Sequence, residues 1–232
     1  MTEDHPDYAD WCHSLRQRDL PVYIAVEGPI GVGKTTLTKQ LARTLNYETL
    51  LEKAEDNPFL SRFYAKQDNA ALPTQLFFLF QRVQQVNELK QGDMFQPVRI
   101  ADFLIEKDPL FAEVTLDDHE LQLYQQVYEH LTIDAPKPDL VVYLQAPSNV
   151  LLERIEKRGI RHERAINADY LNRLNDAYTR FFHFYDEAPL LIVNASEIDW
   201  HNSFQDYKDL VETMLATSRG RHYYNPKARL EL

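Results

Sequence analysis

The chain has 232 residues, of which 36 are acidic and 25 basic, so its formal net charge is −11. This acidity argues against a protein that follows a nucleic-acid backbone, because neutralising phosphates requires a field of Lys and Arg. With 44% apolar and 12% aromatic residues, the composition excludes disordered, collagen-like and low-complexity classes. Glycine is scarce, with 6 residues, and half of them fall within residues 28–33.

The N-terminal segment, residues 1–20, is an acidic leader without a clear hydrophobic period, so we expect it to be weakly ordered or helical. It has neither the positive start nor the apolar run of a signal peptide, and the longest apolar runs of the chain have only the length of strands. The single cysteine, Cys12, has no partner for an intrachain disulfide. These features predict a cytoplasmic protein that does not span a membrane.

Apolar runs and helical patterns alternate along the rest of the chain. The runs that predict β-strands are residues 22–26, 47–51, 98–101, 140–144 and 190–193. Amphipathic helical patterns occupy residues 37–45, 74–90, 110–130, 147–158 and 167–186. Continuous apolar strands that alternate with helices are typical of a parallel sheet covered on both faces. The sequence therefore predicts an α/β fold with a five-stranded parallel sheet flanked by helices, and a single domain over residues 21–232.

The glycine cluster follows the first predicted strand and reads G-x-x-x-x-G-K-T from Gly28 to Thr35, with an amphipathic helix after it. Glycines allow backbone N–H groups to approach phosphate oxygens, and the helix N-terminus adds partial positive charge. This is the context of a phosphate-binding P-loop. It predicts that Lys34 contacts the β- and γ-phosphates of a nucleoside triphosphate and that Thr35 holds Mg²⁺. The predicted nucleotide site comprises Gly28, Pro29, Ile30, Gly31, Val32, Gly33, Lys34, Thr35 and Thr36.

Further motifs indicate the phosphoryl acceptor, which a P-loop alone does not name. They are EGPIGVGKTT at 27–36, Leu51-Glu52 with NPFL and Phe63-Tyr64 after it, Gln75 with Arg82, IEKDPLFA, and ERIEKRGIRHE at 153–163. Over about residues 21–200 the chain resembles the deoxynucleoside kinase family, in particular its bacterial deoxyadenosine and deoxyguanosine kinase branch. The resemblance implies a P-loop kinase fold, ATP with Mg²⁺, and a small-molecule deoxynucleoside as acceptor. Kinases of this family are often homodimers, so we expect a homodimer.

Glu52 ends the second predicted strand, and ligands of open parallel sheets bind beyond the carboxyl ends of strands. The resemblance makes Glu52 the base that takes the proton from the nucleoside 5′-hydroxyl. A carboxylate suits this role because a neutral alcohol must lose a proton as it attacks. The alternative is an exposed glutamate at a strand end.

Gln75 and Arg82 are seven residues apart and share one helical face. The helix between them, at residues 76–80, is apolar nearly all round, which predicts burial. The resemblance places Gln75 on the nucleoside base, and Arg82 where enzymes preferring purines or cytosine often keep an arginine. It also implies that Tyr64 and Glu163 hold the 3′-hydroxyl and that Phe111 packs against the base. The alternatives are solvated polar residues, half-buried packing for Tyr64 and an ordinary core phenylalanine.

The segment of about residues 154–164 is locally basic and resembles the family's arginine-rich lid. Arg154 and Arg158 are four residues apart on one helical face. The resemblance implies that such arginines stack near the adenine of ATP and clamp the transferring phosphoryl group, with Arg158 in the second role. Positive charge on a closing segment stabilises a phosphoryl-transfer transition state. A solvated, charged helix end is the alternative.

The end of the third predicted strand departs from the family's pattern. Family members commonly carry an acid–arginine pair there, whereas this chain has Asp102 followed by Phe103. Asp102 can still organise Mg²⁺ or contact the substrate, and the missing arginine puts more of the transition-state charge on the lid. Lys107 and Asp108 stand where the family's base-contacting acid lies, and the sequence leaves open which acid pairs with Arg82.

Two other functions stay open. A thymidylate-type nucleoside monophosphate kinase shares the P-loop, but its phosphate acceptor needs an arginine clamp that Phe103 does not provide. A non-catalytic structural subunit is expected to have lost site residues, and here Gly28, Lys34, Glu52 and Gln75 are all present. We therefore predict ATP-dependent phosphorylation of the 5′-hydroxyl of deoxynucleosides, purines in particular, giving monophosphates for nucleotide salvage.

Overall fold

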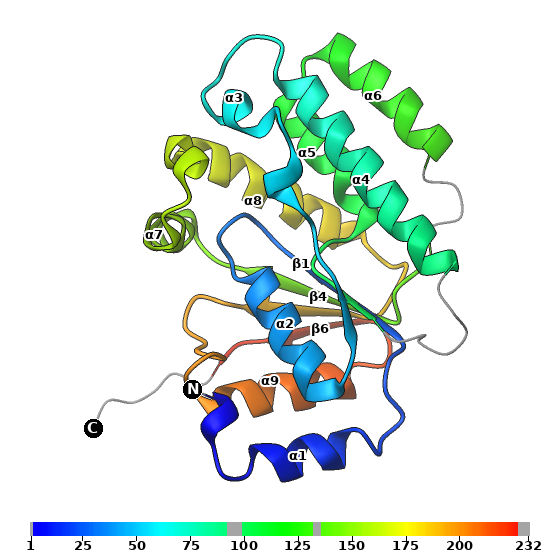
Figure 1. Ribbon diagram of the computed structural model, residues 1–232, viewed down its shortest axis with the longest axis vertical. Helices are drawn as coiled ribbons and strands as arrows, with labels where there is room; N and C mark the ends of the chain where they lie inside the picture. The colour runs from blue at the N-terminus through cyan, green and yellow to red at the C-terminus, as the bar shows by residue number, and fades with distance from the viewer. Residues whose placement is uncertain (1, 92–98, 132–135, 227–232) are drawn as a thin grey trace.

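A six-stranded parallel sheet lies at the centre of the computed structural model, which describes residues 2–91, 99–131 and 136–226 (Figure 1). The strand order is β2-β3-β1-β4-β5-β6, and every neighbouring pair is parallel. The strands are β1 (Tyr23–Glu27), β2 (Glu48–Leu50), β3 (Arg99–Ala101), β4 (Leu140–Gln145), β5 (Leu190–Asn194) and β6 (Arg221–Tyr224). The predicted α/β class with a parallel sheet is confirmed. Val98, placed in the third predicted strand, lies outside the described residues.

The strand count of five was wrong because the edge strand β6 was missed. This strand reads Arg-His-Tyr-Tyr, and its residues are exposed or half-buried. It pairs with β5, with Leu190 opposite Arg221. A strand that is not buried on both faces does not read as a continuous apolar run, so apolar content gave no signal for it.

Helices cover both faces of the sheet. Those in the described ranges are α1 (Tyr8–Leu15), α2 (Lys34–Leu45), α3 (Leu60–Tyr64), α4 (Ala71–Gln91), α5 (Asp108–Thr115), α6 (Asp118–Leu131), α7 (Ser148–Arg158), α8 (Ala168–Phe184) and α9 (Phe204–Ala216). Short 3₁₀ turns are η1 (Thr2–Asp4), η2 (Ala54–Asp56), η3 (Ile105–Lys107) and η4 (Arg161–Ala165). Within these ranges, every helix falls short of the length or apolarity that crossing a bilayer requires.

The single helix expected over residues 110–130 is in fact two, α5 and α6. Leu116 has extended backbone, with φ −95° and ψ 151°, and ends α5. Asp117 then accepts hydrogen bonds from the backbone N–H groups of His119 and Glu120, both at 2.9 Å. An aspartate that caps the first turn in this way starts a new helix.

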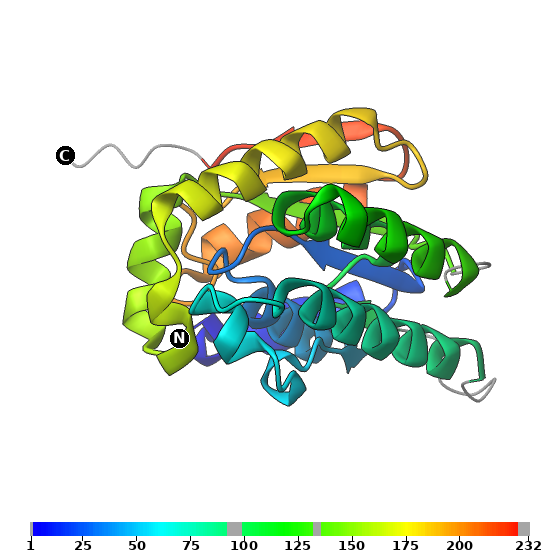
Figure 2. The ribbon, with the colours of Figure 1, turned by 90° about the horizontal axis from the view of Figure 1, so that it is seen from above.

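Alternate strand residues point to opposite faces of the sheet, and each set meets different helices. Ile24 and Val142 belong to a core shared with α1, α2, α7 and α9. Ala25 and Val141 belong to a core shared with α5 and α8. Figure 2 shows α8, in yellow, running alongside β5, in orange. This two-sided cover leaves the carboxyl ends of the strands as the edge where functional residues collect.

The N-terminal leader, expected to be weakly ordered or helical, contains the helices η1 and α1. Trp11 and Leu15 of α1 are buried in the same core as the sheet. The Trp11 indole donates to Glu212 Oε1 at 3.0 Å, and its ring packs edge-on against Tyr207 with centroids 5.7 Å apart. The division of the chain into a leader and a domain that starts at residue 21 stays a prediction.

Candidate active site

The loop between β1 and α2 is shaped by glycines packed too tightly for any side chain. A Cβ on Gly28, where φ is +151°, would meet the carbonyl oxygen of Leu144 at 2.5 Å. A Cβ on Gly33, where φ is +106°, would meet the Trp200 ring at 2.9 Å. Helix α2 begins at Lys34, so the free N–H groups of its first turn adjoin the loop. The predicted strand–loop–helix arrangement of residues 22–45 is present, and it is suited to anions.

Lys34 reaches back over this loop. Its Nζ donates to the carbonyl oxygens of Gly28 at 2.6 Å and Pro29 at 3.2 Å. Burial lowers the pKa of Lys34, and the neighbouring charge of Lys107 lowers it further. In the described part of the chain Lys34 forms no salt bridge within 4.0 Å. Its ammonium therefore remains available for a phosphate group.

Asp102 joins the phosphate-binding loop to the end of β2. Its Oδ2 accepts the hydroxyl of Thr35 at 2.5 Å, and its Oδ1 accepts the backbone N–H of Glu52 at 2.7 Å. Burial raises the pKa of Asp102, against the effect of the Thr35 hydrogen bond. A hydroxyl beside a carboxylate is the kind of hard oxygen donor set that Mg²⁺ prefers, so these two side chains fit the metal. The described residues hold no cluster of three or more His, Cys, Asp or Glu side chains that could bind a metal ion.

Two ion pairs connect Glu52 through Arg82 to Asp108. Nη2 of Arg82 contacts Glu52, and Nη1 contacts Asp108. The sequence left open which acid pairs with Arg82, and the structure shows that Asp108 does. Burial alone would raise the pKa of Glu52, but the charges of Arg82, Lys107 and Lys34 outweigh it and lower that pKa. Burial raises the pKa of Asp108 to about 6 despite Arg82. Glu52 is therefore ionised at neutral pH and able to accept a proton.

Gln75 and Arg82 are both buried, as predicted, with 4% of each residue exposed. The burial predicted for the apolar residues between them is complete at Leu79 and partial at residues 76–78, and the prediction is wrong at Phe80, which is 54% exposed. Gln75 Nε2 donates to the hydroxyl of Thr115 at 3.1 Å. Arg82 Nε and Asp108 Oδ2 are buried and have no hydrogen-bond partner among the described residues. Arg82 of α4 and Asp108 of α5 thus keep one unpaired donor and one unpaired acceptor among the described residues.

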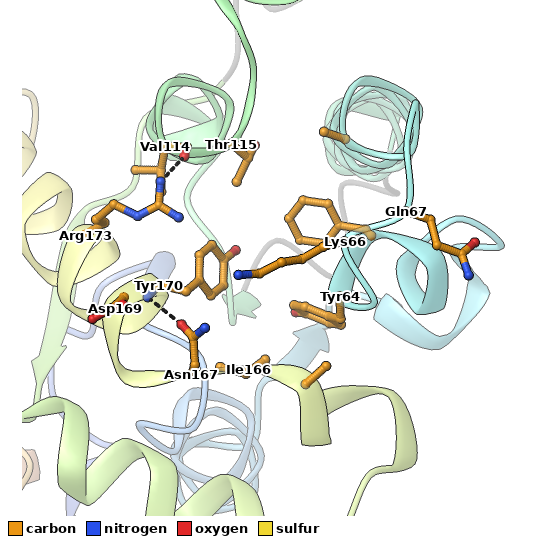
Figure 3. A pocket seen from close by; sticks show the side chains of 13 residues that line it. Tyr64, Lys66, Gln67, Val114, Thr115, Ile166, Asn167, Asp169, Tyr170 and Arg173 are labelled. Atoms are coloured by element: carbon orange, nitrogen blue, oxygen red, sulfur yellow. Dashed lines mark hydrogen bonds between the residues drawn. The ribbon is translucent and has the colours of Figure 1, made fainter.

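A cavity of about 660 Å³ lies between α3, α5 and α8 (Figure 3). Tyr64 and Tyr170 line it, and Lys66 extends between them in the close view. Thr115, the partner of Gln75, also lines it, so the cavity adjoins the predicted base-binding side chain. Its volume is that of pockets for small organic ligands.

Phe111 of α5 packs against Tyr178 of α8. Its ring meets Tyr178 edge-on, with centroids 5.9 Å apart, and Lys107 Nζ lies 5.0 Å from its centroid. Phe111 does not line the cavity. Its contact with a nucleoside base stays a prediction.

The predicted lid consists of the end of α7 and the turn η4, joined at Gly159, where φ is +72°. Arg154 donates to the carbonyl oxygens of Val32 at 3.1 Å and Ala195 at 2.7 Å. This guanidinium therefore lies against the phosphate-binding loop, as a nucleotide-binding role requires.

Arg158 is paired with Glu163. Its Nη2 lies 2.6 Å from both carboxylate oxygens, and its Nε donates to Oε2 at 3.1 Å. Next to Glu163, the ring of His162 is parallel to that of Tyr64, with centroids 6.0 Å apart. Tyr64 and Glu163, the two side chains predicted to hold the 3′-hydroxyl, are thus on the neighbouring elements α3 and η4. Glu163 also pairs with Arg158, the arginine predicted to contact the phosphoryl group.

Comparison with known proteins shows to which family this architecture belongs. The family model for deoxynucleoside kinases matches residues 24–217. The chain belongs to the deoxynucleoside kinase family. Deoxyguanosine kinase of Bacillus subtilis (strain 168) is 42% identical over 161 residues, which cover 67% of this chain and 76% of the relative. Deoxyadenosine kinase of Dictyostelium discoideum is 29% identical over 212 residues, covering 88% and 82%.

Solved structures of the family share the fold of this kinase. Deoxyadenosine kinase from M. mycoides with bound dATP superposes with a TM-score of 0.71 at 26% identity, and covers 82% of this chain and 99% of its own. The expected resemblance, the P-loop kinase fold and the identity as a phosphotransferase are confirmed. Membership favours deoxynucleoside phosphorylation over both the monophosphate kinase and the non-catalytic alternative.

The sequence analysis assigned no role to Glu27, the last residue of β1. Its carboxylate is fully buried, directly before the phosphate-binding loop of this kinase. It accepts the N–H groups of Gly28 at 2.7 Å and Leu104 at 2.9 Å, and the hydroxyl of Tyr178 at 2.8 Å. Lys107 Nζ lies 3.2 Å from its Oε1 and 3.1 Å from its Oε2. A glutamate at the end of an apolar strand was the available signal, because Glu is almost never fully buried without a partner.

Proposed function

We propose that this kinase transfers the γ-phosphoryl group of ATP to the 5′-hydroxyl of purine deoxynucleosides, giving monophosphates for nucleotide salvage. One observation carries the proposal: the carboxylate of Asp102 binds both Thr35 of the phosphate-binding loop and the backbone of Glu52. Asp102 therefore holds the hydroxyl of Thr35, on the ATP side of the site, close to Glu52, the candidate base. Relatives named deoxyguanosine and deoxyadenosine kinase support the purine preference.

The reacting groups follow from this arrangement. Glu52, ionised at neutral pH, takes the proton of the 5′-hydroxyl as the hydroxyl oxygen attacks the γ-phosphorus. The bond from the γ-phosphorus to the β,γ-bridging oxygen breaks, and ADP leaves with its electron pair. Lys34 binds the β- and γ-phosphates in place of its present carbonyl partners. Arg158 contacts the transferring phosphoryl group. Mg²⁺, when bound through Thr35 and Asp102, neutralises negative charge on the phosphate oxygens.

The acceptor enters through the cavity lined by Tyr64 and Thr115. When the base binds, Gln75 gives up its hydrogen bond to Thr115 and forms hydrogen bonds to the edge of the base. Arg82 Nε donates to the base and Asp108 Oδ2 accepts from it. A purine edge offers both donors and acceptors, which suits such a mixed pair. Tyr64 and Glu163 bracket the 3′-hydroxyl, and Phe111 packs against the base.

We also propose a homodimer in the cytoplasm. Phe80 on α4 and Leu123 on α6 expose 54% and 49% of their surface, and these two helices share the cluster that contains Leu79 and Tyr124. Apolar side chains exposed on neighbouring helices favour association with a second copy. Sedimentation of the wild type and of Phe80→Glu tests this: a dimer for the first and a monomer for the second is expected, and a monomeric wild type contradicts it.

The deciding experiment is a panel of the four deoxynucleosides with ATP and Mg²⁺, scored for monophosphate product. Deoxyadenosine or deoxyguanosine is expected to react fastest, and chelating the metal with EDTA is expected to stop turnover. If thymidine reacts while both purines are inert, the purine proposal is wrong. Turnover of dTMP in place of free nucleosides would instead identify a monophosphate kinase.

A further inference from the structure

The candidate base, Glu52, lies just beyond a short strand at the edge of the sheet. In the described sheet β2 pairs with β3 and has no strand on its outer side, and it ends at Leu50. Residues 51–53 follow in neither helix nor strand. Backbone N–H and C=O groups that leave a sheet need other hydrogen-bond partners. The position of Glu52 therefore depends on contacts outside the ladder of the sheet.

Helix α4 supplies two such contacts from a pair of glutamines one helical turn apart. Gln85 Nε2 donates to the carbonyl oxygen of Leu51 at 2.7 Å. Gln81 Nε2 donates to the carbonyl oxygen of Lys53 at 3.2 Å, and this oxygen also accepts the N–H of Asp56 at 3.1 Å. The carbonyl groups directly before and after the candidate base are thus bound to the same face of α4.

The peptide group that joins Leu51 to Glu52 is held at both of its polar atoms. Its N–H donates to Asp102 Oδ1 at 2.7 Å, and its carbonyl oxygen accepts from Gln85 at 2.7 Å. A peptide group is planar, so hydrogen bonds at its two opposite edges set its orientation. They also set the direction in which the side chain of Glu52 leaves the backbone.

The carboxylate of Glu52 is bound by the same turn of α4, because Arg82 lies between the two glutamines in the sequence. A general base acts only within hydrogen-bond reach of the proton that it takes. Misplacing a reacting group by about 1 Å can cost about a hundredfold in rate. The contacts that fix the backbone of Glu52 are therefore placed to affect turnover.

Packing alone does not explain the two glutamines. Gln85 is buried and Gln81 is half-buried. The amide oxygen of each is buried and has no hydrogen-bond partner among the described residues. An unpaired buried acceptor costs free energy that an apolar side chain of the same length would not. The cost is accounted for if the amides are kept for the carbonyl groups to which they donate.

We propose that Gln85 and Gln81 are positioning residues for phosphoryl transfer: by binding the carbonyl groups on either side of Glu52, they hold its carboxylate in line with the 5′-hydroxyl of the acceptor. This inference rests on the proposed role of Glu52 as the base. Helix α4 then serves both ends of the acceptor, since Gln75, proposed to contact the nucleoside base, lies on the same helix.

Gln85→Met removes the amide donor and keeps the length of the side chain. Its kcat is expected to fall about tenfold, because the base is held less precisely. The dissociation constants of ATP and of the deoxynucleoside are expected to stay within about threefold. The thermal midpoint is expected to change by less than about 3 °C, because the lost hydrogen bond is offset by removal of the unpaired oxygen. An unchanged kcat would overturn the proposal.

Gln81→Met is a second variant, at a position less buried than Gln85. Its kcat is expected to fall about threefold, less than in Gln85→Met, because the carbonyl oxygen of Lys53 keeps the N–H of Asp56. A kcat equal to that of the wild type would contradict the role of Gln81, and would do so even if Gln85→Met failed to fold.

Gln84→Met is the matched control on the same helix. Gln84 is exposed, and its Nε2 donates to Glu88 Oε1 at 3.2 Å instead of to the segment that carries the base. Its kcat is expected to stay within about twofold of the wild type. A loss as large as that of Gln85→Met would mean that any disturbance of α4 lowers turnover, and would refute the positioning role.

Combination with Glu52→Gln separates positioning of the base from a merely structural role. If Gln85 acts through the carboxylate of Glu52, Gln85→Met costs nothing more once that carboxylate is gone. The double variant is therefore expected to have a kcat within about twofold of that of Glu52→Gln alone. A further tenfold loss would show that Gln85 supports the site in another way, against the proposal.

Failure of this inference can be told from failure of the proposed function. If the wild type phosphorylates no deoxynucleoside, the proposed function is wrong. If the wild type is active, Glu52→Gln is impaired and both glutamine variants keep their kcat, only the positioning role is wrong.

Discussion

Arg158 and Glu163 form a two-pronged ion pair across the hinge-like Gly159, with Nη2 of Arg158 2.6 Å from both carboxylate oxygens. Glu163 is buried, whereas the Arg158 side chain is 44% exposed. The proposed roles of the two residues compete with this pair, because the 3′-hydroxyl needs Glu163 and the phosphoryl group needs Arg158. If both proposed roles hold, binding of the 3′-hydroxyl to Glu163 and binding of the phosphoryl group to Arg158 each require this ion pair to open.

Glu163→Gln is expected to lower kcat/KM for a 2′-deoxynucleoside ten- to a hundredfold, about the value of a hydrogen bond to a charged group. With the matching 2′,3′-dideoxynucleoside, which lacks the 3′-hydroxyl, variant and wild type are expected to differ by less than about threefold. Steady-state kinetics with both substrates measures the difference. An equal loss of kcat/KM on the two substrates would show that Glu163 does not bind the 3′-hydroxyl.

Glu52→Gln is expected to lower kcat at least a few hundredfold, within the usual range of about 10² to 10⁴ for general base catalysis. Binding of the deoxynucleoside, followed by calorimetry, is expected to stay within about threefold, because the amide keeps the shape of the side chain. Glu55→Gln, at an exposed glutamate in the turn η2, is the control and is expected to be neutral. Retained turnover in Glu52→Gln would rule out the base assignment.

Gly28→Ala is expected to abolish ATP binding and lower the thermal midpoint, because its Cβ would lie 2.5 Å from the carbonyl oxygen of Leu144. Gly220→Ala separates the clash from the backbone strain, since Gly220 also has positive φ, +69°, but nothing within 4 Å of a Cβ. That control is expected to lose about 1 to 3 kcal/mol of stability and to bind ATP normally. Nucleotide binding by fluorescence and thermal melts check both. Normal ATP binding by Gly28→Ala would refute the packing argument.

The affinity for deoxyadenosine is expected to fall as the pH drops below about 6, where burial places the pKa of Asp108. Above this value the ionised Asp108 Oδ2, which has no hydrogen-bond partner in the described part of the chain, is the proposed acceptor for the adenine amino group. Below it the carboxyl is protonated, and since Oδ1 is paired with Arg82, the proton turns Oδ2 into a donor. Titrations across pH 5 to 8 are expected to show an inflection in the wild type and none in Asp108→Asn. An inflection that persists in the variant would assign it to another group.

The sequence by itself determined the parts of this protein that depend on local pattern. The strand, glycine loop and helix of residues 22–45 are contiguous, so their order and spacing predicted the phosphate-binding loop that the structure contains. The burial of Gln75 and Arg82 followed from the apolar residues of their own helix. The edge strand β6 was missed because an exposed edge needs no apolar run.

Tertiary structure alone decided which of these groups meet. Asp102 binds Thr35 and Glu52, which are 67 and 50 residues away, because parallel strands bring their carboxyl ends to one edge of the sheet. Sheet register and helix packing likewise paired Arg82 with Asp108 and Glu27 with Lys107. A sequence contains the charges but not the distances between them. The partners of buried charges, and with them the pKa values of the site, therefore follow only from the folded chain.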